Sequence, residues 1–367
     1  MEPSVRERTG RVGPGVLRGE PSHPAVAGRI PGPPRTLVLH ADDLGFSPAI
    51  NRGIIDGFQR GLLTSTSVLA NAPAVADALT LWNELELRRR HRLLASDGPR
   101  RRLRDPWLPF DLGVHLNLTQ GRPLTTGYPQ ELLDSQGRFP GIGGLFARSL
   151  VAVSSAIRSA VEHELQTQIE LLLDHGAPLG HLNGHQYVEC LPLLSEIVPR
   201  LALRYSLRSV RVAWEPGLTR GLLIQGAPRE WGLAQIKRLF AFRWKLRATR
   251  HGLRFPQCYF GTAHAARITA DVLRRFLQAA RGNFVEIGMH PGQQPLTLRM
   301  SNPSATDEEN GFSLDDDWRD PLAAHRPREL ELLTNLDVAE WIADSGWILG
   351  RLSQLGLTTA ARQRQAA

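Results

Sequence analysis

The alternation of short apolar runs with helical patterns is the feature that most restricts how this chain can fold. Residues 36–41 (TLVLHA) form an apolar run typical of a buried parallel strand, and residues 48–60 then repeat apolar side chains at helical spacing. Residues 64–70 are rich in β-branched side chains, and residues 74–85 form a second helical pattern. This βαβα order predicts parallel strands joined by helices rather than a series of hairpins.

The same alternation continues through the rest of the chain. We expect further extended segments at residues 111–118, 179–183, 209–213, 257–260 and 284–289, and a Gly- and Pro-rich loop at 121–144. Further helices are expected at residues 154–175, 191–205, 234–247, 270–281, 328–335 and 338–344. Six or seven strands without a repeat of fixed period predict an α/β fold, a TIM-like (β/α) barrel that is distorted or one strand short. A doubly wound open sheet is the alternative.

The net charge of +8, from 44 Lys and Arg against 36 Asp and Glu, is confined to two segments. Residues 1–34 hold five Arg and three Glu, and residues 88–106 hold eight Arg and two Asp, so these segments contribute +2 and +6. The remainder is charge-balanced, which argues against a basic groove and a nucleic-acid partner. We expect a disordered basic tail at 1–34, a single barrel domain at 35–355 with an exposed Arg-rich insertion at 88–106, and a tail at 356–367.

The composition excludes several protein classes. At 42% hydrophobic residues the 367-residue chain can bury a large core, yet it has no run of 18 apolar residues that could span a membrane. No apolar run follows the first arginines, so a secretory signal is not expected. The two cysteines, Cys190 and Cys258, form no disulfide framework, and the cytoplasm is the expected compartment.

Side chains that can bind a metal lie at the ends of four expected strands. They are Asp42 and Asp43, His115, His185 and His290. Because the carboxyl ends of barrel strands meet at one face, where barrel enzymes hold their active sites, we expect these side chains to converge. One Asp and two His form a set of N/O ligands that leaves positions open for water and substrate. The sequence therefore predicts a catalytic metal site.

Each of these motifs also has a structural interpretation when taken alone. The Asp42–Asp43 pair could cap the helix that begins at Pro48, although Ser47 competes for that role. A lone strand histidine such as His115 is more often a hydrogen-bonded structural residue than a ligand. His290 lies in GMHPG, where Pro and Gly turn the chain, so it could donate a proton at the rim or merely cap the turn.

Four neighbouring residues are weaker candidates. We interpret His40 and His181 as structural, and Cys190 as a buried neutral thiol. Glu189 could be a partner of His185 or simply a charge at a helix N-terminus.

Five motifs, in order, resemble one known family. ADDLGFSPAINRGI, GLLTSTSVLANAP, GVHLNLTQGRPL, HLNGHQYVECLP and VEIGMHPG are similar to the YdjC-like carbohydrate deacetylases, the family of chitooligosaccharide deacetylase and of the hopanoid-biosynthesis deacetylases. The resemblance runs from about Arg35 to Gly350. It implies a distorted (β/α) barrel related to the polysaccharide deacetylases, which binds one divalent metal ion, Mg²⁺ or Zn²⁺, and removes an acetyl group from an N-acetylated carbohydrate.

The resemblance also implies roles for the strand-end residues. Asp43, His115 and His185 would bind the metal, and Asp42 would be the general base. His290 would be the acid or a substrate-binding residue.

Other positions are open. Asn71 and Arg211 lie near strand ends and could contact the sugar, or make ordinary loop hydrogen bonds. Tyr187 stands where members of the family often carry a histidine, so the acceptor or the metal affinity could differ. The alternatives are a metal-dependent phosphoesterase and a non-catalytic protein that binds sugar or, through its Arg-rich loop, another protein. A homodimer is a further expectation.

Overall fold

The computed structural model describes residues 35–95, 110–151, 154–215, 228–294, 312–315 and 317–356. These residues belong to one compact unit that begins at Pro34. The predicted tail at residues 1–34 lies outside the described residues, as does all but the first residue of the tail predicted at 356–367.

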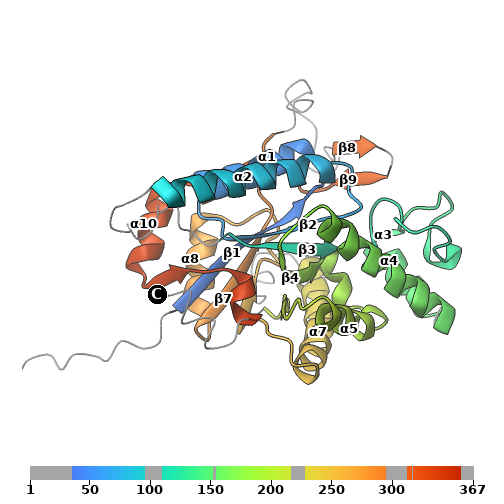
Figure 1. Cartoon of the computed structure of the whole chain (residues 1–367). Helices are drawn as coiled ribbons and strands as arrows, with labels where there is room; N and C mark the ends of the chain where they lie inside the picture. The colour runs from blue at the N-terminus through green and yellow to red at the C-terminus, as the bar shows by residue number, and fades with distance from the viewer. Residues whose placement is uncertain are drawn as a thin grey trace, which may run out of the picture. The chain divides into compact units, whose positions relative to one another are not determined.

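A parallel sheet forms the centre of the fold (Figure 1). Its principal strands are β1 (Arg35–Leu44), β2 (Ser65–Val68), β3 (Leu112–Leu116), β4 (Leu179–Gly184), β5 (Ser209–Val210), β6 (Cys258–Phe260) and β7 (Phe284–Met289). They lie in the order β5-β4-β3-β2-β1-β7-β6, and a short strand, β10 (Trp347–Leu349), pairs with the start of β1. Because β1 lies between the second strand and the seventh, the order is that of a barrel rather than of a doubly wound sheet.

The two edge strands are joined by the segment that precedes β6. The backbone N–H of Val210 donates to the carbonyl of Arg254 at 2.8 Å, and the N–H of Arg254 donates to the carbonyl of Arg208 at 2.8 Å. Ser209 and Arg254 form a parallel bridge at this point. The predicted distorted (β/α) barrel is therefore confirmed.

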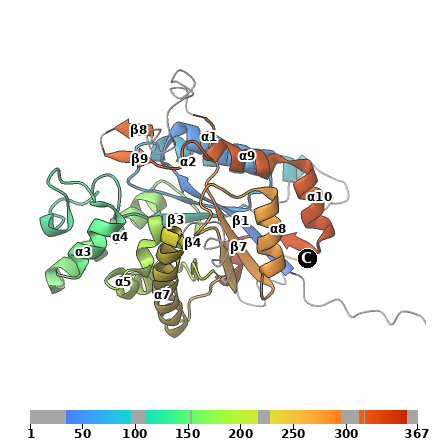
Figure 2. The ribbon, with the colours of Figure 1, turned by 180° about the vertical axis from the view of Figure 1, so that it is seen from behind.

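Helices cover the outside of the sheet (Figures 1 and 2). They are α1 (Pro48–Gln59), α2 (Val75–Ala95), α3 (Gly141–Ser149), α4 (Ser155–Asp174), α5 (Leu194–Arg204), α7 (Pro228–Arg250), α8 (Ala270–Ala279), α9 (Arg326–Thr334) and α10 (Leu336–Asp344). Ser47 caps α1 by accepting a hydrogen bond from the N–H of Ile50, which confirms that Ser47 rather than the Asp pair starts this helix. Among the described residues, no helix is long and apolar enough to cross a membrane.

Helix α2 includes the first part of the predicted Arg-rich insertion at 88–106. Helix α2 continues to Ala95, so residues 88–95 extend a helix instead of leaving it. Ion pairs one turn apart support the extension, because Arg88 lies 3.3 Å from Glu84 and Arg89 lies 2.9 Å from Glu86. The rest of the insertion, residues 96–106, lies outside the described residues.

Two further differences concern short elements around the site. The loop expected at 121–144 contains a 3₁₀ turn at Gln130–Leu132, and helix α3 begins at Gly141. An antiparallel hairpin that the sequence did not predict, β8 (Phe312–Asp315) with β9 (Trp318–Asp320), precedes α9. Helix α3 and the hairpin lie near the carboxyl ends of the strands, and residues of both line the cavity described below.

Candidate active site

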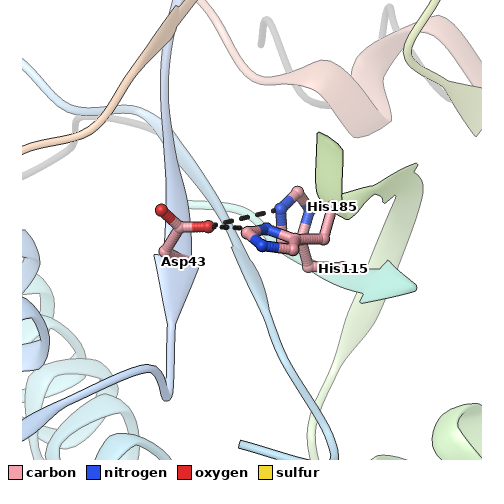
Figure 3. A group of neighbouring side chains, drawn as sticks. All are labelled: Asp43, His115 and His185. Atoms are coloured by element: carbon pink, nitrogen blue, oxygen red, sulfur yellow. Dashed lines mark hydrogen bonds and ion pairs between the residues drawn. The ribbon is translucent and has the colours of Figure 1, made fainter. Parts of the chain in front are cut away.

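Asp43, His115 and His185 converge at the carboxyl ends of β1, β3 and β4 (Figure 3). Oδ1 of Asp43 lies 3.1 Å from Nδ1 of His185 and 3.5 Å from Nε2 of His115. All three side chains are buried, and each offers one ligand atom within 4.8 Å of the others. Two imidazole nitrogens and one carboxylate oxygen facing a common point can hold a metal ion.

Asp43 is fixed from its other side by a residue far along the chain. Nη2 of Arg326 donates to Oδ2 of Asp43 at 2.7 Å, which leaves Oδ1 directed at the two imidazoles. Asp320 in turn binds Arg326 through hydrogen bonds of 2.8 and 3.0 Å. Burial opposes ionisation of Asp43, but Arg326 and the imidazoles outweigh burial and hold its pKa well below the ordinary value. The carboxylate is therefore charged and oriented before any ligand arrives.

The hydrogen bonds of His115 set its tautomer. Nδ1 of His115 lies 2.9 Å from Oδ1 of Asn183, whose own Nδ2 donates to Asp42 at 3.0 Å. Because an amide oxygen only accepts, Nδ1 carries the proton and the lone pair of Nε2 faces Asp43. Burial lowers the pKa of His115, but the two carboxylates outweigh burial and raise it. The raised pKa reflects the two carboxylates, Asp42 and Asp43, that face His115.

His185 is placed by a sharp turn directly after β4. The turn is the 3₁₀ segment His185–Cys190, in which Gln186 and Tyr187 have positive φ angles of 53° and 63°. A Cβ atom at Gly184 would lie 2.3 Å from Oε2 of Glu189 and 2.8 Å from Cγ2 of Val188, so a larger residue would have to displace these side chains. The predicted strand-to-loop turn is therefore present, but its left-handed residues are Gln186 and Tyr187, and Gly184 itself is extended.

Asp42 lies beside this cluster with its own set of partners. Oδ2 accepts a hydrogen bond from Nη1 of Arg211 at 2.6 Å, and Oδ1 accepts one from Asn183. Burial opposes ionisation, but Arg211 and the neighbouring imidazoles outweigh it and lower the pKa of Asp42 below its ordinary range. Nε2 of His290 lies 3.8 Å from Oδ2 of Asp42. Asp42 is thus an ionised carboxylate that Arg211 holds beside the metal-binding cluster.

The comparisons with known proteins fit this geometry. A model of the family described as "YdjC-like protein" matches residues 36–344. The chain belongs to the YdjC-like family. A carbohydrate deacetylase of Mus musculus is 26% identical over 324 residues, 84% of this chain and 91% of that protein. A carbohydrate deacetylase of Geobacillus stearothermophilus is 33% identical over 182 residues, and the match spans 49% of this chain but only 62% of the bacterial relative.

A solved structure supports the fold of this YdjC-like protein. It comes from Enterococcus faecalis V583 and is described as a candidate cellobiose-phosphate cleavage protein. It is 21% identical, covers 89% of this chain and 100% of its own, and superimposes with a TM-score of 0.59.

His290 lines the same site of the YdjC-like protein and is held through its backbone. Its N–H donates to Oε2 of Glu329 at 2.6 Å. Burial lowers the pKa of His290 despite the nearby carboxylates, so its imidazole is neutral. Burial likewise raises the pKa of Glu329 to about 7.

A cavity of about 610 Å³ lies over these groups. Its lining includes all five residues predicted from the strand ends: Asp42, Asp43, His115, His185 and His290. Most of the remaining lining is apolar and includes Phe46, Ile142, Phe146, Leu191, Ile236, Phe240 and Leu322. Gln120, Tyr187 and Lys237 add polar atoms along the sides. The cavity is large enough for a small ligand and brings it to the metal cluster.

Neither residue expected to contact the sugar lines this cavity. Arg211 is fully buried and binds Glu286 at 2.8 Å in addition to Asp42. Asn71 donates to the carbonyls of Gln120 at 3.3 Å and Arg122 at 3.1 Å. The geometry therefore gives no support to direct sugar contacts at these positions. Arg211 orients Asp42, and Asn71 braces the loop after β3.

The three residues interpreted as structural, His40, His181 and Cys190, are buried inside the protein. His40 is fully buried and lies 3.5 Å from Asp42, and His181 lies 2.9 Å from Asp111. Burial raises the pKa of Cys190 well above its ordinary value, so the thiol is neutral.

Sequence reasoning missed the residues of α9 and the segment before it. Arg326, Asp320 and Glu329 hold Asp43 and His290 from positions near the end of the chain. No motif or spacing connects them with the strand ends, because only the packing of α9 on α1 lets Arg326 reach Asp43 and Glu329 reach His290.

Proposed function

We propose that this YdjC-like protein is a metal-dependent hydrolase that removes the acetyl group from an N-acetylated sugar. The observation that carries the proposal is the position of Asp42, an ionised carboxylate beside the Asp43, His115 and His185 cluster. A protein that only binds sugar does not need a base next to its metal. The relatives named carbohydrate deacetylases support the choice of substrate.

The cluster would hold one divalent cation, Mg²⁺ or Zn²⁺. Two imidazoles and one carboxylate form a donor set that suits Zn²⁺ better, because Mg²⁺ prefers oxygen ligands. When bound, the cation would polarise the acetamide carbonyl and lower the pKa of a water molecule.

The remaining steps belong to side chains of the protein. Asp42 would accept the proton of the attacking water, and Arg211 would keep Oδ2 of Asp42 in place. His290 is neutral at rest, so it cannot supply a proton of its own at the start of the reaction. The proton taken up by Asp42 would therefore reach the leaving amine directly or through Nε2 of His290, 3.8 Å away. The products would be acetate and the free amino sugar.

Acetate release from a panel of N-acetylated mono- and oligosaccharides, with and without a chelator, tests the proposal. We expect acetate release that the chelator abolishes and that added Zn²⁺ or Mg²⁺ restores. Phosphate release from sugar phosphates is measured in parallel, because a metal-dependent phosphoesterase would give phosphate and no acetate. Acetate release that is unchanged by complete removal of metal would overturn the mechanism.

A further inference from the structure

The outward face of helix α7 carries an apolar stripe. We define the α7 stripe as Leu239, Phe242 and Leu246, which are 59%, 42% and 44% exposed. At 100° per residue these side chains point away from the opposite face of α7, where Ala241 and Trp244 are buried. The stripe is therefore the solvent side of a helix whose other side already packs on the core.

Helix α7 around the stripe carries charge of one sign, and one of its basic residues, Arg247, pairs with Glu196 of α5 at 2.9 Å. Residues 235–250 contain six Lys and Arg and no Asp or Glu, although the sequence outside the two Arg-rich segments is balanced as a whole. Helical spacing places Arg243 and Arg250 along one flank of the stripe and Arg238 and Lys245 along the other. An exposed apolar stripe between two basic flanks is the pattern of a helix that lies on an anionic membrane surface.

An aromatic residue extends the face. The partly exposed ring of Trp214 packs against Phe242, with the ring centroids 5.3 Å apart. Arg238 and Lys245 lie over the Trp214 ring at 5.1 and 5.2 Å. Tryptophan beside basic side chains fits the boundary between lipid tails and head groups, where an amphipathic ring is most stable.

The face adjoins the mouth of the cavity. Ile236, 56% exposed and one turn before Leu239, lines the cavity together with Phe240 of the same helix. Helix α7 runs along the outside of the fold beside α5 (Figures 1 and 2). We propose that the α7 stripe and its basic flanks dock the protein on an anionic lipid surface, with the cavity mouth next to that surface.

Vesicle sedimentation tests the docking without any need for catalysis. The full chain, stripped of metal and without substrate, is mixed with vesicles of phosphatidylcholine containing phosphatidylglycerol, or of phosphatidylcholine alone. We expect binding to the anionic vesicles, weak binding to the neutral ones, and release by added salt. No binding to either vesicle, or equal binding to both, would overturn the proposal.

Variants locate the contact. Replacement of all three stripe residues by Ser (Leu239→Ser, Phe242→Ser and Leu246→Ser) should abolish vesicle binding, whereas Ile348→Ser, at an equally exposed position on β10, should not. Arg243→Gln and Arg250→Gln keep the apolar stripe and should each weaken binding about fivefold. The arginine variants also serve as the test if the Ser variant does not fold. Wild-type binding by all of these variants would contradict the proposal.

Two further measurements separate this proposal from the others. If the Ser variant changes the oligomeric state in size-exclusion chromatography and leaves vesicle binding intact, the stripe is an interface between copies and docking fails. Acetate release from a soluble substrate should be the same in the Ser variant and the wild type. Loss of vesicle binding with retained hydrolysis supports docking, and vesicle binding by a protein that never releases acetate would refute only the proposed function.

Discussion

Oδ2 of Asp43 and Nη2 of Arg326 lie 2.7 Å apart although 283 residues separate them in sequence. Oδ2 of Asp43 is therefore used for the ion pair with Arg326, and Oδ1, which faces the imidazoles, is left to bind a metal. We predict that Arg326→Gln weakens metal binding by about 10- to 100-fold, the usual effect of losing a partner that orients a ligand. Isothermal titration with Zn²⁺ measures the change. Arg328→Gln, at an exposed position of the same helix, is the control, and equal affinities in the two variants would remove the orienting role.

Substitution of Asp42 should affect catalysis, whereas substitution of the ligand residues should affect metal binding. Asp42→Asn should retain bound metal but lower the rate of acetate release by about 10²- to 10⁴-fold, because the base is lost and the ligands remain. His115→Ala and His185→Ala should lose the metal itself. Metal analysis of each purified variant, together with acetate assays, distinguishes the two outcomes. Near-normal turnover by Asp42→Asn would show that another group is the base.

Stability should depend on pH through Glu189. Both of its carboxylate oxygens are buried without a hydrogen-bond partner among the described residues, and burial raises its pKa to about 8. The unfolded chain loses this proton near the model-peptide value of 4.5, whereas the folded chain keeps it, so the free energy of unfolding falls as pH rises from 4.5 to about 8.

Replacement of this carboxyl by an amide tests the pH effect. Glu189→Gln should match the wild type near pH 5 and exceed its stability near pH 8, because the wild type loses about 1.4 kcal/mol for each pH unit in this range. Urea unfolding at the two pH values measures the difference, and Glu331→Gln, at an exposed site, should change neither. A stability difference that is the same at both pH values would mean that Glu189 titrates normally.

Gly184, the residue before His185, should resist substitution. A Cβ atom at Gly184 meets Glu189 at 2.3 Å and Val188 at 2.8 Å, so Gly184→Ala should destabilise the protein by about 1–3 kcal/mol and displace His185. Thermal unfolding and zinc titration should both report the change. Gly232→Ala on α7, where a Cβ meets nothing within 4 Å, should be neutral or stabilising. An unchanged zinc affinity in Gly184→Ala would argue that His185 is placed by other contacts.

The strand-end residues were predictable because sheet geometry alone brings them together. Asp43, His115 and His185 follow apolar runs whose parallel pairing puts their carboxyl ends at one face. Arg326 and Glu329 could not be predicted, since they reach the site only when α9 packs on α1.

The length of helix α2 could not be predicted from apolar periodicity, because ion pairs between neighbouring turns extend the helix. Helix α2 continues to Ala95 through charged residues, where ion pairs between neighbouring turns replace an apolar pattern. Asn71 and Arg211 lie close to the site, as their strand-end positions suggested. Their side chains bind other parts of the protein, and the direction of a side chain depends on partners that sequence spacing does not identify.

The backbone at Asp43 has a φ angle of 70°, a left-handed conformation that few non-glycine residues adopt. It breaks the regular alternation of a strand, so two consecutive side chains, Asp42 and Asp43, both line one cavity. Their Cα atoms are joined by a single peptide unit and stay about 3.8 Å apart when the strands of the sheet move. Movement of one strand relative to another therefore cannot separate the backbone of Asp42, the proposed base, from that of Asp43, a proposed metal ligand.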